Sequence, residues 1–301
     1  MTYASTKLGK WDFNFFRLLG PGLGNLLFPW ARMVAASKKN GWRMLWPTWP
    51  QLKIGSIIRG EQDKRFYSDL FRNPGYYVDG THKAWIRLRQ QKFEESVSNS
   101  ERVAMGKGLV VFQGMEGLFS PILEQRDLIH GSLIEMTRPE HLAGLSHDFS
   151  GAMTIHLRMG DFRPTSDSML RSGAFNVRLP LPWIKDVIAY TRAELGSSLD
   201  VFLFSDGTDR DLRDLLQIPG VQRLNFGSAL SDMLAMSCSR LMVVASTFSM
   251  WSAYLGNVPS IYYPGQMRMS LSDDRDAEIE YEAGLGMPMK FMQRINAGYM
   301  G

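Results

Sequence analysis

The stretch GAMTIHLRMGDF, residues 151–162, holds the pattern that decides the fold. Its apolar first half predicts a buried strand, and the glycine and aspartate near its end predict a loop. Outward from it, helices are predicted at 181–195, 208–218 and 248–257, and strands at 199–207, 240–246 and 260–264. Strands that alternate with helices indicate a parallel sheet covered on both faces. The second half of the chain is therefore expected to have an α/β fold.

The first half is less regular. The stretch LLGPGLGNLLFPWARMVAASKKNG (18–41) predicts a glycine turn followed by a helix that stops at Asn40-Gly41. Its other expected elements are strands at 13–19, 42–46 and 107–114 and a helix at 120–133. The chain is thus divided into an N-terminal domain (1–148) and a second domain (149–272). The acidic, Met-rich tail (273–301) is expected to be helical and to pack back across the domains.

The glycine turn has the spacing Gly20-x-Gly22-x-Gly24-Asn25. A dinucleotide site needs glycine or alanine where Asn25 stands, and an acid about 20 residues later to hold the ribose. No Asp or Glu occurs between Phe13 and Gly60, so the sequence argues against NAD. The turn still allows close approach of the backbone to a ligand, with Asn25 reaching toward it. The alternative is a tight turn with Asn25 as a helix cap.

Composition narrows the class of protein. The 301 residues are enough for two domains, and 45% hydrophobic with 21% charged residues is typical of a folded soluble chain. We find no apolar run of about 18 residues and no secretory signal. The single cysteine, Cys238, permits no intrachain disulfide, which fits a reducing cytoplasm.

Net charge is +4, and the basic residues concentrate where acids are absent. Between Phe13 and Gly60 these are Arg17, Arg32, Lys38, Lys39, Arg43, Lys53 and Arg59. A field of one sign favours anionic ligands, phosphates or an acidic membrane surface. A solvated basic face is the alternative.

Polar side chains follow three predicted strands of the second half. His156 and Arg158 lie on one face of the first strand end, and arginine is suited to bidentate phosphate contact. Asp206, after Ser205, could accept hydrogen bonds from a guanine edge. A third strand leads into a helix that opens at Ser246, Thr247 and Ser249, where free N–H groups can bind an anion.

Each of these signals has a structural alternative: a buried histidine, a turn aspartate, a capping serine or threonine. Ligands of parallel α/β sheets bind at the carboxyl ends of the strands. Taken together, the three strand ends predict one crevice that takes a nucleotide diphosphate.

Four segments, GPGLGNLLFPWA (20–31), HLRMGD (156–161), FSD (204–206) and DMLAMSCSRLMVVASTFSMWSAYL (232–255), resemble motifs of the α-1,2-fucosyltransferases. The resemblance implies a GT-B fold, with two Rossmann-like domains that face each other across a cleft. It implies GDP-fucose as the donor, bound mainly by the second domain, and an acceptor on the N-terminal side. It also implies that the reaction requires no metal ion and no other cofactor.

The resemblance also assigns roles. Arg158 would bind the diphosphate, and His156 and Asp206 would contact guanine. Gly22, Gly24 and Asn25 would face the donor from the N-terminal domain. The remaining donor-binding residues would be Ser205, Ser246, Thr247, Phe248 and Ser249. The chain departs from the family pattern at Met159, where a second arginine is usual, at Leu26-Leu27-Phe28, and at Gly207, where a second aspartate is usual.

The implied reaction is an inverting transfer of fucose to a glycan hydroxyl, O2 of a galactose, in the synthesis of a surface polysaccharide. The acceptor would be a galactose-containing glycan or a lipid-linked oligosaccharide, reached at the inner face of the membrane; nucleic acid is not an expected partner. Asp161 is the nearest acid by motif and our candidate for the base. The alternatives are another nucleotide sugar, another acceptor, or a non-catalytic protein that binds a nucleotide or a glycan.

Two Asp-x-Asp matches, Asp209 with Asp211 and Asp274 with Asp276, could instead indicate a metal-dependent glycosyltransferase. The first pair stands where a helix is predicted to begin, and acids are favoured there by the helix dipole. The second pair stands in an acidic stretch expected to be exposed. We therefore interpret both as structural.

Overall fold

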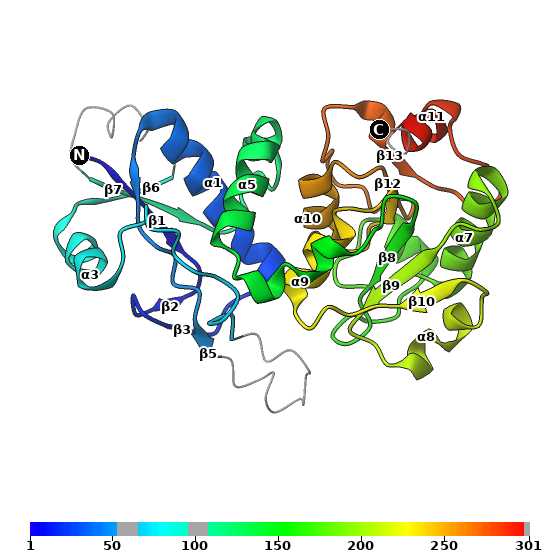
Figure 1. The fold of residues 1–301 in the computed structure, drawn as a ribbon, viewed down its shortest axis with the longest axis horizontal. Coiled ribbons are helices and arrows are strands. Elements are labelled where there is room, and N and C mark those ends of the chain that lie inside the picture. The colour runs from blue at the N-terminus through cyan, green and yellow to red at the C-terminus, as the bar shows by residue number, and fades with distance from the viewer. Residues whose placement is uncertain (53–65, 96–107, 298–301) are drawn as a thin grey trace. The chain divides into compact units, whose positions relative to one another are not determined.

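The computed structural model describes residues 1–52, 66–95 and 108–297, which form two units, Met1–His141 and Leu142–Gly301 (Figure 1). The division falls before residue 148 because the joining segment packs on the second unit. There the short helix η3 (Ala143–Ser146) contacts helix α9 (Ala229–Met236). A Cβ on Gly144 would lie 2.5 Å from the carbonyl oxygen of Ser231, so this contact requires glycine.

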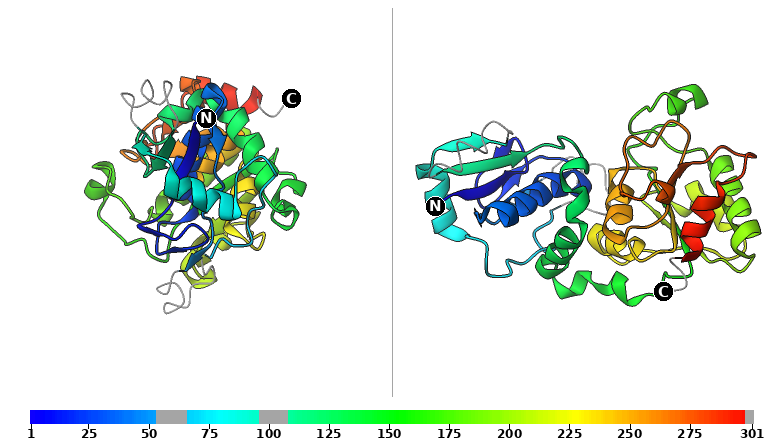
Figure 2. Two further views of the ribbon diagram at one scale, coloured as in Figure 1. Left: turned by 90° about the vertical axis from the view of Figure 1, so that its left-hand side faces the viewer. Right: turned by 90° about the horizontal axis from the view of Figure 1, so that it is seen from above.

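The first unit is built on a four-stranded parallel sheet of order β4-β1-β7-β6. Its strands are β1 (Tyr3–Lys7), β4 (Arg43–Met44), β6 (Lys92–Glu94) and β7 (Leu109–Gln113). Helix α1 (Leu23–Asn40) lies along β1 and β7, as Figure 2 shows, and Gly41 ends it with a φ of 66°. The other helices are α3 (Gly80–Arg89), η1 (Ser120–Gln125), α5 (Arg126–Met136) and η2 (Pro139–His141). The predictions of α1, β4, β7 and the helix around 120–133 are confirmed.

The prediction of a main-sheet strand at 13–19 is wrong. The strand of the four-stranded sheet that precedes α1 is β1. Its sequence, YASTK, looks polar, although Ala4, Ser5 and Thr6 are buried. Residues 13–19 contribute only β3 (Arg17–Leu18), because Asn14 (φ 75°) and Leu19 (φ 57°) adopt left-handed conformations that interrupt an extended chain. Strand β3 pairs with β2 (Trp11–Asp12) and β5 (Gln51–Leu52) in a small separate sheet.

The second unit contains a six-stranded sheet of order β10-β9-β8-β11-β12-β13, parallel throughout. Its strands are β8 (Met153–Leu157), β9 (Val201–Ser205), β10 (Val221–Arg223), β11 (Leu241–Val243), β12 (Ser260–Tyr262) and β13 (Glu278–Glu280). The helices are α6 (Asp167–Arg171), α7 (Leu181–Leu195), α8 (Asp209–Leu216), α9, α10 (Thr247–Gly256) and α11 (Met289–Ala297). The alternating pattern predicted for this half is confirmed. Its helices cover the sheet around a core that includes Ile155, Leu203 and Val243.

The tail differs from the expectation of a helix. It begins with η4 (Arg275–Ala277), continues as the edge strand β13 beside β12, and becomes helical only at α11. Phe291 and Ile295 of α11 are buried in the core of the second unit. The described part of the tail therefore completes that unit.

None of the helices in the described ranges is both long and apolar enough to span a bilayer.

Candidate functional site

The strand order of the second unit reverses between β8 and β11. From β8 the chain proceeds outward through β9 and β10, and then returns to β11 on the other side. The carboxyl ends of two such neighbouring strands are not bridged by one connection, and this leaves a crevice that binds ligands in open α/β sheets. His156 and Arg158 come from the β8 end, while Ser246, Thr247 and Phe248 follow β11. The topology thus brings these residues to the ends of neighbouring strands, and the shared crevice stays a prediction.

His156 lies at the centre of this edge. Its Nδ1 atom is 3.3 Å from Oγ of Ser246, and its ring centroid is 4.9 Å from that of Phe248. The side chain is buried, and burial, followed by the positive charge of Arg158, lowers the pKa of His156 well below its ordinary value. The imidazole is therefore neutral at physiological pH. Its Nε2 atom has no hydrogen-bond partner within the described part of the chain.

Arg158 is held between two carboxylates. Its Nη2 donates to Oδ1 of Asp161, and its Nε lies 3.3 Å from Oδ2 of Asp206 without the alignment of a hydrogen bond. The guanidinium carbon is 5.2 Å from the centroid of the Phe162 ring. About a fifth of the arginine side chain (22%) is exposed, so a ligand can reach it. To bind a diphosphate in the usual bidentate way, the guanidinium must exchange at least one carboxylate contact for phosphate oxygens.

Asp206 connects the ends of β9 and β8. Its Oδ1 accepts hydrogen bonds from the backbone N–H groups of Met159 (2.7 Å) and Gly160 (3.3 Å). Next to it, Oγ of Ser205 accepts from the N–H of Gly207 at 3.0 Å. The structural alternative for Ser205 and Asp206, a turn, is thus present in the fold. Contact of Asp206 with guanine stays a prediction.

Two of the departures from the family pattern are neighbours in space. A Cβ on Gly207 would lie 2.8 Å from Cβ of Met159, and the methionine side chain is itself buried. Met159 and Gly207, which stand where the family pattern has a second arginine and a second aspartate, therefore pack against each other.

Two arginines that the sequence reasoning missed hold the loops of this site. Arg178 donates Nε to the carbonyl oxygen of Phe162 (2.8 Å) and Nη2 to that of Met159. Arg223, at the end of β10, donates Nη2 to the carbonyl oxygens of Ser205 (3.1 Å) and Gly207 (2.7 Å). Arg223 could have been found at a strand end only if β10 had been predicted, and three residues are too few to show the alternation of apolar and polar side chains that marks a strand. For Arg178 the sequence gives no signal at all.

Helix α10 is capped by its own residues. Oγ of Ser249 accepts from the N–H groups of Ala245 (3.0 Å) and Ser246 (3.1 Å), and the serine is fully buried. Ser249 therefore acts as the structural alternative predicted for it, a capping serine. Ser246 and Thr247 stay partly exposed at the start of the helix.

Gly22, Gly24 and Asn25 lie in the first unit, at the start of α1. Gly22 is the N-cap, so the expectation that Asn25 caps the helix is wrong; Asn25 is the third residue of the helix. It lines a cavity of about 180 Å³ together with Lys7 and Gly114, at the carboxyl ends of β1 and β7. Its role toward the donor stays a prediction.

Both Asp-x-Asp matches have the structural roles expected of them. Asp211 forms a capping box with Thr208 (Thr208 N to Oδ2, 2.8 Å), and Asp209 pairs with Arg223 at 2.6 Å. Asp274 accepts from the N–H of Asp276 at 3.0 Å. Within the described ranges, no three His, Cys, Asp or Glu side chains gather closely enough to hold a metal ion.

No protein-family model matches the chain, and no curated protein matches it either. Solved structures do. A variant of FUT1 from Arabidopsis thaliana, in complex with GDP, is 11% identical with a TM-score of 0.54, over 95% of this chain and 79% of that one. The α-1,6-fucosyltransferase NodZ, soaked with GDP-fucose, is 16% identical with a TM-score of 0.51, over 87% of this chain and 94% of that one. Selenomethionine NodZ from Bradyrhizobium gives 15% and 0.50 over the same shares of the two chains.

At identities this low, what the chain shares with these fucosyltransferases is the fold. The GT-B fold implied by the sequence resemblance is confirmed.

Proposed function

We propose that this protein is a fucosyltransferase that moves fucose from GDP-fucose to O2 of a galactose in a glycan acceptor. The observation that carries the proposal is the placement of Arg158 just beyond the end of β8, at the switch point between β8 and β11. It stands two residues after buried His156, which contacts Ser246 at the start of α10. An arginine fork and a helix N-terminus are the two protein groups best suited to a diphosphate. Two of the similar solved structures, FUT1 in complex with GDP and NodZ soaked with GDP-fucose, are fucosyltransferases with this nucleotide or nucleotide sugar.

In the proposed reaction the acceptor oxygen attacks the anomeric carbon, while the bond from that carbon to the β-phosphate oxygen breaks. The configuration inverts, the electron pair of the broken bond stays on GDP, and the hydroxyl proton passes to a carboxylate. Negative charge therefore grows on the diphosphate in the transition state, where Arg158 stabilises it. Asp161 is our candidate for the base; it is half exposed and must leave Arg158 to accept the proton.

His156 contributes as a neutral imidazole. With Nδ1 beside Ser246, its Nε2 atom is left to contact the donor, and Phe248 fixes the ring from the side. Asp206 holds the loop that carries Arg158, and we propose that its remaining lone pairs meet the guanine edge.

We further propose that transfer takes place at the cytoplasmic face of a membrane, on a lipid-linked acceptor of a surface polysaccharide. The exposed basic residues of the stretch between Phe13 and Gly60, which are Lys38, Lys39 and Arg43, support this placement, because anionic lipid attracts such a surface. Arg17 and Arg32 of the same stretch are buried, and Lys53 and Arg59 lie outside the described residues.

The deciding experiment measures GDP release from GDP-fucose with and without galactosides, with GDP-mannose and UDP-galactose as competing donors. The proposal expects acceptor-dependent GDP release with GDP-fucose alone, and a product in which O2 of galactose is substituted. GDP binding without release in any combination would instead identify a non-catalytic nucleotide-binding protein. Release with another donor would replace fucose by that sugar.

A further inference from the structure

The small sheet of the first unit turns apolar side chains toward solvent. Large apolar side chains on and beside β2, β3 and β5 are exposed to between 36% and 58%; we call them the aromatic flap, and they are Trp11, Phe13, Phe15, Phe16, Leu18, Leu19 and Leu52. The Phe13 and Phe16 rings stack at 5.2 Å, and the N–H of Phe13 donates to the carbonyl oxygen of Phe16. A contiguous exposed apolar patch of this kind marks an interaction surface.

The groups beneath the flap are polar. Arg17 is fully buried and donates Nε to the carbonyl oxygen of Thr48 at 3.1 Å. Lys83 is also buried; its Nζ donates to the carbonyl oxygen of Asn14 (2.7 Å) and to Oγ1 of Thr48 (3.2 Å). Burial lowers the pKa of Arg17 to about 10 and that of Lys83 to about 8.

This arrangement inverts the usual order of a soluble protein, in which cations face water and aromatic rings face the core. The buried cations anchor the backbone of the flap and leave its rings pointing outward. The rings are therefore displayed by the fold, and the surface they make is suited to an apolar environment.

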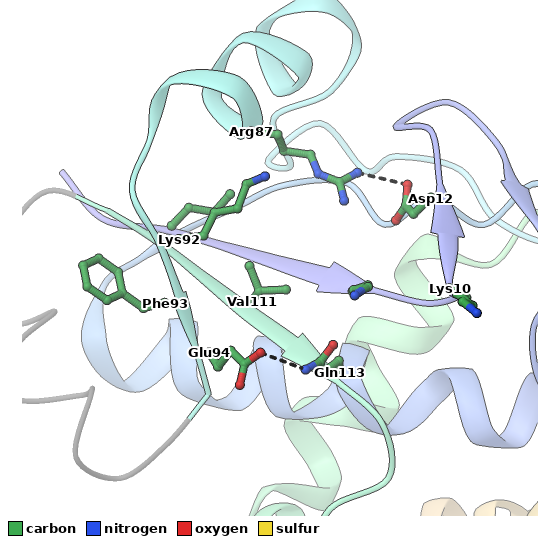
Figure 3. Close-up of a pocket in the computed structure, with 10 residues that line it drawn as sticks. Lys10, Asp12, Arg87, Lys92, Phe93, Glu94, Val111 and Gln113 are labelled. Atoms are coloured by element: carbon green, nitrogen blue, oxygen red, sulfur yellow. Dashed lines mark hydrogen bonds and ion pairs between the residues drawn. The ribbon is translucent and has the colours of Figure 1, made fainter.

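The charge beside the flap is positive. The only acid in residues 1–60 is Asp12, whose carboxylate is buried and pairs with Arg87 at 3.0 Å. Next to it, a cavity of about 410 Å³ is lined by Lys7, Lys10 and Lys92, which have no carboxylate partner among the described residues (Figure 3). One further acid lines this cavity, Glu94, which accepts from Gln113 at 3.4 Å.

We propose that the aromatic flap docks on an anionic lipid bilayer, with its rings in the headgroup region and the three lysines against lipid phosphates. Trp and Phe are residues of membrane interfaces, and lysines beside them gain from the negative potential of anionic lipid. The excess of cations beside the rings favours a bilayer over a second copy of this chain, which carries the same positive charge. The inference rests on the membrane placement proposed above, names the surface responsible, and does not depend on which sugar is transferred.

Flotation of the whole protein with vesicles tests this. Vesicles in which phosphatidylglycerol replaces part of the phosphatidylcholine should bind the chain, and those of phosphatidylcholine alone should bind it much less. The double variant Phe15→Ser/Phe16→Ser should weaken binding about tenfold or more, because each ring loses its buried apolar area. The control, Leu285→Ser/Met289→Ser, removes two apolar side chains of the second unit that are even more exposed, and it should bind as the parent does. Lys10→Glu/Lys92→Glu should remove most of the preference for anionic lipid.

Two outcomes would overturn the proposal: no binding to anionic vesicles, or equal binding by the Phe15→Ser/Phe16→Ser variant. A parent dimer that this variant turns into a monomer in sedimentation, without any lipid binding, would assign the flap to a second copy instead. Acceptor-dependent GDP release without vesicles is measured on the same samples. Lipid binding without sugar transfer would then contradict the proposed transfer reaction alone. Transfer without lipid binding would contradict the flap and the membrane placement, and leave the transfer reaction standing.

Discussion

At the scale of single residues, Arg158 is the side chain on which the proposed chemistry depends. Its guanidinium offers two parallel N–H groups to phosphate oxygens. We expect Arg158→Ala to lower kcat about 100-fold or more, since a preorganised charge donor is lost from the transition state. Arg158→Lys should not restore kcat, because a point charge cannot make the bidentate contact. Steady-state rates of GDP release check this.

Arg213→Ala is the matched control, because Arg213 is an exposed arginine on α8 outside the site. It should keep the parent rate. Near-normal turnover in Arg158→Ala, with the fold intact by circular dichroism, would make Arg158 a structural residue and move the site elsewhere.

His156 gives a prediction in pH. Its pKa is lowered in the folded chain, mainly by burial and next by Arg158, while in the unfolded chain it titrates near 6.5. Below that pH the unfolded state binds a proton that the folded state does not, so the free energy of unfolding must fall as the pH falls. In His156→Gln this part of the pH dependence should disappear. Urea unfolding of both proteins at pH 7.5 and 5.5 measures it, and equal losses of stability on acidification would contradict it.

At the scale of elements, the N-terminus of α10 depends on Ser249. Ser249→Ala would leave the partly buried N–H groups of Ala245 and Ser246 without their acceptor, and we expect a loss of about 1–2 kcal/mol in the free energy of unfolding. Ser252→Ala is a close control, because Ser252 is equally buried in the same helix and its Oγ has no partner. That variant should be as stable as the parent or more stable. Denaturant unfolding of the parent and the two variants measures these differences in the free energy of unfolding.

The elements also show which parts of the fold the sequence can predict. The helix expected at 181–195 is found as Leu181–Leu195, because its apolar spacing and Gly196 signal both its face and its end. Strand β1 was missed because the small polar residues Ser5 and Thr6 are buried, and the aromatic run at 13–19 looked like the better strand. Periodicity detects apolar faces, and it fails where tertiary structure buries polar side chains or exposes aromatic ones.

The candidate site was predictable where it follows from topology. His156 and Ser246 meet because β8 and β11 are neighbours, and strand–helix alternation in the sequence predicts such an edge. The hydrogen bonds that Arg178 and Arg223 donate to the loops of the site were not predictable. Their acceptors are backbone carbonyl oxygens, which every residue carries, so the sequence does not indicate them. Nor does the sequence reveal that Gly207 and Met159 are in contact.

At the scale of the whole molecule, the second unit has its own sheet and its own core. We therefore expect residues 142–301, expressed alone, to unfold cooperatively and to bind GDP within about tenfold of the full chain, a difference of about 1.4 kcal/mol. Calorimetric titration with GDP, with and without a chelator, measures both the affinity and any dependence on metal. A folded fragment that does not bind GDP would assign a necessary share of the nucleotide site to the first unit, with Asn25 as the first residue to test.

The two carboxylates around Arg158 have a consequence for how quickly the product departs. In the proposed reaction Asp161 would compete with GDP for the guanidinium of Arg158, and the carboxylate would return to Arg158 as the spent nucleotide leaves. Asp161→Asn removes that competition. We expect the variant to bind GDP more tightly than the parent, which calorimetric titration with GDP measures without requiring turnover. If the proposed function holds, a carboxylate beside the arginine would then protect the protein against inhibition by its own product.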